Sequence, residues 1–408
     1  MDIQNLINNR QELIGYMESS GYSVSYIRKL KLEIEHVVSE AASKNWESYA
    51  DIYSEYTHKS DAQHCLGDKH ALLGIIEDFD TKSQFPTGRL RQKRGKYHLL
   101  SEEFKAAIDY YREAEKKRGI KDQTIYVSSL NTAGLFYDLQ SNGISQLSEI
   151  TEESIISSFV RPDGSLRRGC SFMKNVRMVF KACIPQNPGE FKRVLAFLPE
   201  FRKQRKNIQY LTPEETTSLR ETLTDSDSPL SLRDRAIGAL AFYTGMRSCD
   251  IAGLTLGSID WDNDIISIKQ QKTGTLCELP LKAVVGNAIY DYLITERPQN
   301  ECDYVFLTMC GPIRRMESDN MRSVAKKIMK AADIRQSAGD RKGLHIFRHR
   351  VATQLLQNDV PRPVISRALG HDSPESLEPY LSADFKHLKE CALSILKFQV
   401  AKGVFGDA

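Results

Sequence analysis

The stretch of sequence that decides the fold runs from residue 345 to residue 380 and reads HIFRHRVATQLLQNDVPRPVISRALGHDSPESLEPY. His345 and Arg348 are three residues apart at the start of a predicted helix, so their side chains share one face of it. His371 follows a Leu-Gly pair that is typical of a helix C-terminus, and Tyr380 comes nine residues later, after a proline. These polar residues interrupt an otherwise apolar pattern, and together they predict a chemical site.

Two basic residues further upstream belong to the same pattern. Arg247 follows a predicted buried helix that ends at Gly245. Lys272 lies at the tip of a predicted hairpin, in a region where β-favouring runs alternate with turn residues. We therefore expect a three-stranded meander among helices. Each of the six residues also has a structural alternative, such as an ion pair between Arg247 and Asp250.

The six side chains are the groups that phosphoryl transfer without a metal needs. Two guanidinium groups can bind the non-bridging oxygens of a phosphodiester, each through two hydrogen bonds. A lysine can protonate the leaving oxygen, a histidine can accept the proton of the nucleophile, and a tyrosine can form a covalent phosphate ester. The sequence shows no Asp/Glu cluster suited to Mg²⁺, so we expect neither a metal ion nor a cofactor.

Residues 211–385 resemble the catalytic domain of the tyrosine recombinases, the phage integrase family. The matching stretches are Tyr243-Thr244-Gly245-Met246-Arg247 with Asp250 and Leu254, Lys272-Thr273-Gly274, His345-Ile346-Phe347-Arg348-His349 with Ala352-Thr353, Leu369-Gly370-His371, and Tyr380. Two departures do not touch the six candidate residues. Asp250 stands where the family usually has Glu, and Glu378-Pro379 precedes Tyr380 where a Thr-x-x-Tyr run is common.

The resemblance implies a site-specific DNA recombinase, or integrase, that cleaves and rejoins DNA without a metal ion. Tyr380 would attack the scissile phosphate, form a 3′-phosphotyrosine link and release a 5′-hydroxyl. The other implied roles are phosphate binding by Arg247, Arg348 and His371, general-acid catalysis by Lys272, and general-base catalysis by His345 toward Tyr380.

The expected fold is mainly α with a small β-meander, an α+β chain in three domains. Residues 1–98 form a helical N-terminal accessory domain for arm-type or additional DNA binding, and residues 201–408 form the mixed α/β catalytic domain with a C-terminal docking helix. Residues 99–200 resemble the family's SAM-like core DNA-binding domain, and we expect four helices there, beginning near residues 101, 124, 151 and 171.

Basic residues are clustered, although the net charge of the chain is only +3. Such clusters in a near-neutral chain favour contact with phosphates, because binding releases condensed counterions. The candidate DNA contacts are Arg89, Arg91, Lys93, Arg94, Arg167, Arg168, Lys174, Arg202, Lys203, Arg205 and Lys206.

Composition excludes several other classes of protein. Hydrophobic residues make up 41% of the chain and charged residues 27%, which are ordinary globular values rather than those of a disordered chain. No apolar run is long enough for a membrane span, and the first residues do not resemble a secretory signal. Eight cysteines without a Cys-x-x-Cys pair favour a reducing cytoplasm. We expect a cytoplasmic, nucleoid-associated protein of a bacterium or phage, with no membrane contact.

The 98 residues ahead of the two DNA-binding domains favour the integrase or transposon recombinase of a mobile element. The expected partners are double-stranded recombination sites, three further copies in a tetramer joined through the C-terminal helix, and an accessory directionality factor. The alternatives are a Xer-like dimer resolvase and a type IB topoisomerase-like enzyme. A non-enzymatic alternative treats residues 344–369 as a helix-turn-helix regulator, which leaves Arg247, Lys272 and Tyr380 unexplained.

Overall fold

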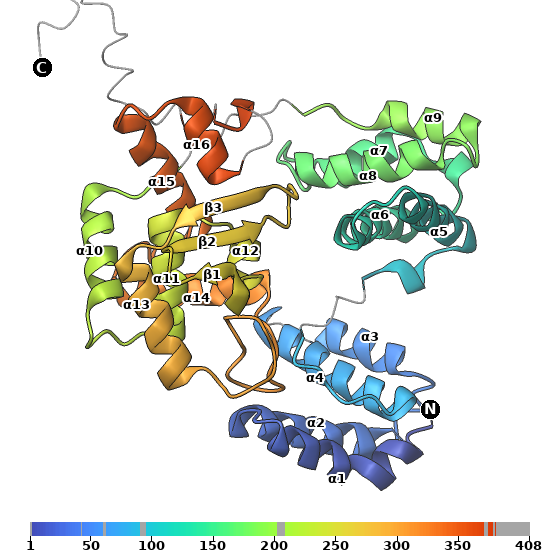
Figure 1. Ribbon diagram of the computed structural model, residues 1–408. Coiled ribbons are helices and arrows are strands. Elements are labelled where there is room, and N and C mark those ends of the chain that lie inside the picture. The colour runs from blue at the N-terminus through green and yellow to red at the C-terminus, as the bar shows by residue number, and fades with distance from the viewer. Residues whose placement is uncertain are drawn as a thin grey trace, which may run out of the picture. The chain divides into compact units, whose positions relative to one another are not determined.

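The computed structural model describes residues 2–41, 43–59, 63–89, 95–201, 209–370, 374–377 and 380 (Figure 1). Contacts divide the chain into two units, one of Met1–Arg89 with Asn207–Ala408 and one of Leu90–Lys206. The described residues are mainly helical, and the strands among them form one three-stranded antiparallel sheet. The expected fold class is confirmed.

Four helices between residues 4 and 82 pack around a hydrophobic core of their own. Leu6, Leu13, Leu30 and Ile52 are fully buried in it. The helical spacing of these apolar residues explains why each helix turns one face inward. The helices are α1 (Gln4–Ser19), α2 (Val24–Glu40), α3 (Tyr49–Lys59) and α4 (Gln63–Lys82).

Hydrogen bonds and an ion pair join residues 2–89 to the segment 308–317 of the same unit, and one of them runs from the Arg314 guanidinium to the Gly88 carbonyl over 2.6 Å. The Gly311 amide donates to the Gly21 carbonyl over 3.1 Å. Arg89 Nε lies 3.1 Å from a carboxylate oxygen of Glu317, and both side chains are partly exposed. These contacts are the reason that residues 1–89 group with the C-terminal half of the chain.

The second unit is helical throughout its regular structure, and aromatic rings fill its centre. Phe104 and Phe136 stack with their ring centroids 4.1 Å apart, and Phe180 packs against Phe136 at 5.8 Å. Such contacts add to the area that each ring buries. The elements are η1 (Tyr97–Leu99), α5 (Glu102–Lys117), α6 (Asp122–Ser141), η2 (Leu147–Glu149), α7 (Glu152–Phe159), α8 (Cys170–Cys183) and α9 (Pro188–Phe197).

The C-terminal half is built around one helix, α11 (Leu232–Thr244), whose Ala236, Ile237 and Leu240 are fully buried. Its neighbours are α10 (Pro213–Thr224), α12 (Ser248–Ala252), α13 (Ala283–Asp291), α14 (Ser318–Ala331) and α15 (His345–Gln357). The other helical elements are η3 (Leu256–Ser258), the π-helical turn η4 (Tyr292–Glu296), α16 (Arg362–Leu369) and η5 (Pro374–Leu377).

The sheet is the expected meander of β1 (Ile259–Asp260), β2 (Ile265–Lys269) and β3 (Leu276–Pro280), in that order. Ile266 pairs with Leu279 and Ile268 with Cys277, and all four side chains face the core. The period-two alternation of a strand produces this one-sided burial. The turn between β2 and β3 carries Lys272, as the sequence predicts.

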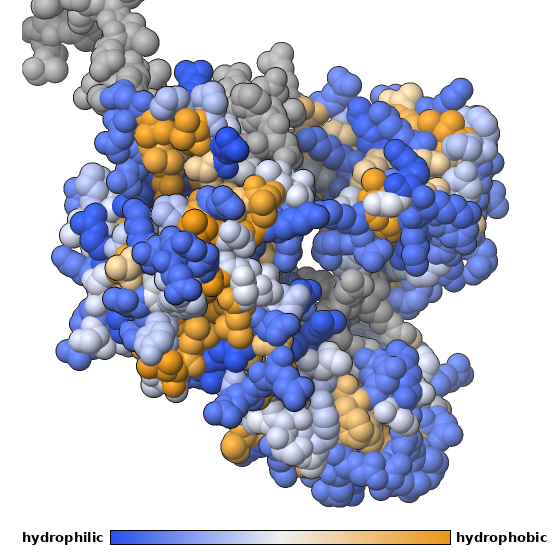
Figure 2. Space-filling view, viewed as in Figure 1, coloured by the Kyte–Doolittle hydropathy of each residue, from blue (hydrophilic) through white to orange (hydrophobic). Residues whose placement is uncertain are grey.

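Polar side chains cover most of the visible face of both units, with apolar residues in small separate groups (Figure 2). One exposed group consists of Trp261, Tyr290 and Ile294, in which the two aromatic rings meet edge to face at 6.4 Å. Small apolar patches of this kind are ordinary on protein surfaces. No helix in the described ranges is long and apolar enough to span a membrane.

Candidate active site

Arg348 lies at the centre of the site, on the first turn of α15, with 2% of its surface exposed. Its guanidinium donates to the Gly245 carbonyl over 3.1 Å and to the Leu369 carbonyl over 2.5 Å. Burial, reinforced by the nearby charge of Arg247, lowers the pKa of Arg348 to about 10. The group therefore stays cationic at neutral pH, and the ends of two helices fix its position.

Arg247 follows the left-handed residue that ends α11 and serves as the N-cap of α12. Its guanidinium donates to the Gly370 carbonyl over 2.9 Å and to the side-chain oxygen of Gln270. An oxygen of the buried Asp250 carboxylate lies 3.9 Å away, and the other accepts from the Gln271 amide at 2.9 Å. The ion pair with Asp250, the structural alternative for Arg247, is present at 3.9 Å, but Arg247 is held mainly by neutral acceptors.

Tyr380 is buried beside Arg348, with 4% of its surface exposed. The Arg348 guanidinium donates a hydrogen bond to its hydroxyl. Burial raises the pKa of Tyr380, and the charges of Arg348 and Arg247 partly offset that rise. The phenol is therefore neutral at physiological pH and needs a base before it can attack phosphorus.

Two histidine rings of α15 lie next to each other, and the second of them contacts the Tyr380 ring. The His345 and His349 rings lie 4.6 Å apart between centroids, and the His349 and Tyr380 rings 5.2 Å apart. Burial and the surrounding cations, Arg348 first among them, lower the pKa of His345. The imidazole of His345 is thus unprotonated at neutral pH, which is the form that accepts a proton.

Lys272 is exposed at the tip of the β2–β3 turn. Its positive charge contributes to the lowered pKa of His345. The turn is closed by the Gly274 amide, which donates to the Gln270 carbonyl over 2.8 Å, and Gly274 adopts a left-handed φ of 75°.

Five of the six candidate catalytic residues are thus brought together from α11–α12, the β2–β3 turn, α15 and the segment that follows η5. His371 lies outside the described residues. It directly follows Gly370, whose φ of 60° ends α16 and whose carbonyl accepts from Arg247. The C-terminal docking helix, expected beyond residue 384, also lies outside the described residues.

The candidate DNA contacts differ in their surroundings. Arg168 is 13% exposed in its side chain, pairs with Asp138 at 2.6 Å and covers the Phe172 ring at 4.4 Å. These contacts give Arg168 a structural role within the second unit. Arg167 is half exposed and also pairs with Asp138, at 3.2 Å. Lys174 is exposed, so these two side chains can reach a polyanion from the surface. Arg89 is exposed and pairs with Glu317 at 3.1 Å. The other seven candidates, Arg91, Lys93, Arg94, Arg202, Lys203, Arg205 and Lys206, lie outside the described residues.

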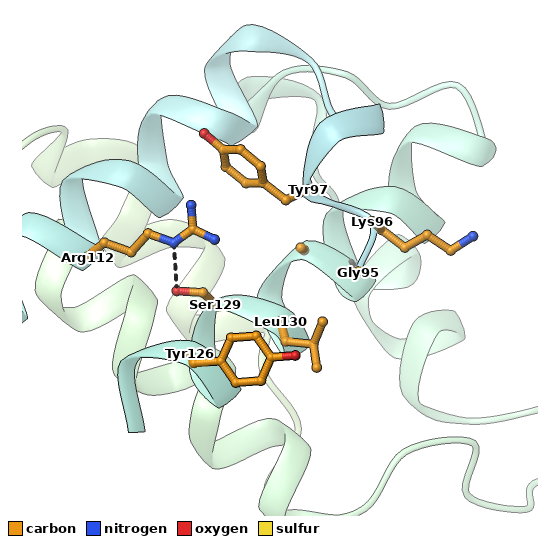
Figure 3. Close-up of a pocket in the computed structure, with 8 residues that line it drawn as sticks. Gly95, Lys96, Tyr97, Arg112, Tyr126, Ser129 and Leu130 are labelled. Carbon is orange, nitrogen blue, oxygen red and sulfur yellow. Dashed lines mark hydrogen bonds between the residues drawn. The ribbon is translucent and has the colours of Figure 1, made fainter. Parts of the chain in front are cut away.

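A small cavity in the second unit is not a competing site. Figure 3 shows Tyr97, Arg112 and Ser129 lining it, with Arg112 reaching Ser129 over 3.3 Å. Its volume is about 30 Å³, which suits one or two water molecules and no nucleotide. Across the described ranges, no group of three or more His, Cys, Asp or Glu residues is placed to hold a metal ion.

Comparison with known proteins shows which family has this sequence pattern. The model of the phage integrase family matches residues 209–387. "Putative integrase/recombinase y4gC" of Sinorhizobium fredii is 34% identical over 168 residues, which are 41% of this chain and 85% of that protein. The chain belongs to the phage integrase family. Members of this family are tyrosine recombinases, so the expected enzyme class, a DNA recombinase, is confirmed.

Other phage integrase family members match over different lengths. A second Sinorhizobium fredii protein, y4rA, is 33% identical, but the matched segment covers only 40% of its length. Tyrosine recombinase XerC of Lacticaseibacillus casei is 24% identical over 70% of this chain and 95% of its own length. The structure of XerH bound to its difH substrate matches with a TM-score of 0.54 at 20% identity, covering 84% of this chain and 93% of that chain, which shows a shared fold.

Sequence reasoning assigned no role to two residues that the structure places inside the site of this family member. Gln270 accepts from Arg247, and His349 contacts Tyr380. A signal for Gln270 was present, because the inward-facing positions of β2 continue from Ile266 and Ile268 to residue 270, where a polar amide stands. A buried polar side chain at such a position needs partners.

Proposed function

We propose that this chain cleaves and rejoins duplex DNA at specific sites through a 3′-phosphotyrosine intermediate on Tyr380. The observation that carries the proposal is the buried contact between the Tyr380 hydroxyl and Arg348, next to the partly buried Arg247. A phosphate placed at these guanidinium groups meets the Tyr380 hydroxyl, which already contacts Arg348. The chemistry needs a preorganised cationic site of this kind to stabilise the transition state.

The bond changes balance without an added reactant. The Tyr380 oxygen attacks phosphorus, the bond from phosphorus to the 5′-oxygen breaks, and the phosphate stays attached to the 3′ side of the strand. His345 accepts the phenol proton, and Lys272 gives a proton to the leaving 5′-oxygen. Attack by a 5′-hydroxyl from a second strand reverses these steps and releases Tyr380. One phosphodiester is exchanged for another, so strand joining needs no external energy source.

The remaining roles complete the proposal. Arg247 and Arg348 hold the non-bridging oxygens of the phosphate, and His371 donates to the same group. Residues 99–200 and 201–408 bind opposite sides of the duplex, and the C-terminal segment joins the protomers of a tetramer. Residues 1–98 contribute arm-type or additional DNA contacts. The protein acts on DNA of the nucleoid.

For the biological reaction, we favour integration and excision of a mobile element, assisted by a directionality factor. The similarity to an integrase/recombinase over 85% of its length supports this assignment. A Xer-like dimer resolvase is the second candidate, supported by the match to XerC over 95% of that protein. Mapping cleavage by the purified protein separates the two. Paired sites at the ends of the DNA segment that carries the gene indicate an element, and a single chromosomal site indicates a resolvase.

The test of the chemistry is Tyr380→Phe. This change removes one oxygen and keeps the ring, so we expect retained folding and DNA binding. The substrate carries a nick just beyond the scissile phosphate, so that the short 5′-hydroxyl fragment diffuses away and the covalent adduct accumulates. Wild-type protein should form a 3′-linked adduct in EDTA, and the variant should form none. An adduct in Tyr380→Phe, or one that requires added Mg²⁺, would contradict the proposal.

A further inference from the structure

Gln270 is a buried amide at the entrance to the Lys272 turn, with 4% of its surface exposed. It follows β2 on the inward face of the sheet, where β3 and α16 pack together (Figure 1). A buried amide is costly unless its oxygen and nitrogen both find hydrogen-bond partners. The partners of Gln270 therefore show what this side chain does.

Three parts of the site meet at this amide. The side-chain oxygen accepts from the Arg247 guanidinium and from the Thr273 hydroxyl, the latter over 3.1 Å. The side-chain nitrogen donates to the Leu369 carbonyl over 3.4 Å. That same carbonyl accepts from Arg348 over 2.5 Å, so the Gln270 amide and the Leu369 carbonyl together link the two arginines.

The backbone of Gln270 closes the turn that carries Lys272. Its amide donates to the Thr275 carbonyl over 2.9 Å, and its carbonyl accepts from the Gly274 amide over 2.8 Å. The side chain and the main chain of one residue thus fix the base of the turn and the first arginine together.

Gly370 shows how closely the amide fits against the end of α16. A Cβ atom on this residue would overlap with the Gln270 side-chain amide, and the φ of 60° also favours glycine. Glycine is therefore favoured at position 370 both by the left-handed backbone and by the lack of space for a Cβ atom. The residue that follows Gly370 in the sequence is His371.

We propose that Gln270 is a positioning residue that holds Arg247 for the phosphate and links it to the turn of Lys272. The inference rests on the proposed function. The neutral charge of the amide is essential, because it accepts a hydrogen bond from Arg247 without cancelling the positive charge that the phosphate needs. A carboxylate at this position would compete with the phosphate for the same guanidinium group.

The test combines two substitutions with Arg247→Ala in double-mutant cycles. Gln270→Glu keeps the size and adds the competing charge, and Gln270→Asn keeps the amide but withdraws it from Arg247 by one methylene. The rate of adduct formation is measured at saturating protein on the nicked substrate, and DNA affinity is measured separately. Gln271→Glu, on the exposed neighbouring side chain, is the matched control for adding a negative charge to the turn.

We expect both Gln270 variants to lower the adduct rate by roughly tenfold to a hundredfold, a fraction of the loss typical for removing a charge-stabilising group. DNA affinity should stay close to that of the matched control. In the Arg247→Ala background the same Gln270 changes should have no further effect, because the group that they position is gone. The circular dichroism spectrum and the unfolding midpoint of each Gln270 variant are compared with those of the wild type. Adduct rates are interpreted only for a variant that matches the wild type in both, and for this reason two variants are made.

Two outcomes would overturn the inference. Adduct rates equal to wild type would show that Arg247 needs no such support. Losses that multiply with the Arg247→Ala loss would show that Gln270 acts through general stability instead. A wild-type protein that forms no Tyr380-linked adduct is a different result, since it would contradict the proposed function itself.

Discussion

His349 is buried between two other rings, and neither of its nitrogens has a hydrogen-bond partner among the residues that the structure describes. Burial, with further contributions from His345, Arg341 and Arg348, lowers its pKa to about 4. The unfolded chain holds this imidazole near an ordinary pKa of about 6.5, so it takes up a proton first as pH falls. The contribution of the unprotonated imidazole to the free energy of unfolding is therefore fully present above about pH 6.5. It is lost progressively as the pH falls toward 4.

We predict that His349→Phe removes part of this pH dependence, since it keeps a planar ring and deletes the titrating nitrogens. Between pH 6.5 and pH 5 the wild-type group accounts for about 2 kcal/mol of the free energy of unfolding. Urea unfolding midpoints at pH 7.5 and pH 5 measure the effect. His98→Leu, which removes an exposed imidazole, is the control and should keep the wild-type dependence. Equal pH dependence in His349→Phe and wild type would contradict the assignment.

The candidate residues could be predicted because their chemical types and order carry the information. The roles of Gln270 and His349 could not, because each depends on contacts made across the fold. Gln270 and Leu369 are separated by 99 positions, and only the packing of α16 on β3 brings them together. Local patterns say that residue 270 faces inward, but not which groups it meets there.

The β2–β3 hairpin carries the residue proposed as general acid. We predict that Lys272→Ala slows cleavage of an ordinary strand by a factor on the order of 10² to 10⁴, the usual range for general-acid catalysis. A substrate with sulfur in place of the bridging 5′-oxygen should largely recover, because a thiol has a pKa of about 8.5 and leaves without a proton. Adduct formation on the two substrates gives the measurement.

Lys269→Ala is the matched control for the hairpin, since it removes the same charge from an exposed position at the end of β2. It should leave the ratio of the two rates unchanged. If Lys272→Ala is equally slow on both substrates, Lys272 acts by binding the phosphate rather than by protonating the leaving group.

Elements with strong local signals could be read from the sequence. The buried helix that we expect to end at Gly245 is α11, and Gly245 ends it in a left-handed conformation. Helix α9 is not among the four helices that we expect in residues 99–200. In the structure Pro188 opens α9, and the Asn187 side chain caps it by accepting from the Glu190 amide over 3.3 Å.

At the scale of the molecule, the described residues of each of the three expected domains have a hydrophobic core of their own. The exact boundaries, 1–98, 99–200 and 201–408, stay predictions. What composition could not reveal is the contact between residues 2–89 and the segment 308–317. It depends on single hydrogen bonds and on an ion pair such as Arg89–Glu317, which leave no periodic signal in the sequence.

DNA binding by the second unit is testable through its salt dependence. Each phosphate contact changes the slope of log K against log salt by about 0.9, because it releases condensed counterions. Arg167 and Lys174 are exposed enough to make such contacts, so replacing both by Ala should flatten the slope by roughly 1.8. Arg168→Ala should instead lower stability, because its largely buried side chain pairs with Asp138 and covers the Phe172 ring.

The matched control replaces Lys116 and Lys117 by Ala, which removes two exposed charges from the last turn of α5 in the same unit. Both double variants change the net charge of the protein equally, so a difference between their slopes reports the position of the charges and not their number. We expect the control to retain the wild-type slope. Equal slopes for the two variants would show that neither Arg167 nor Lys174 contacts phosphate, and the DNA-facing surface of this unit would then have to lie on other helices.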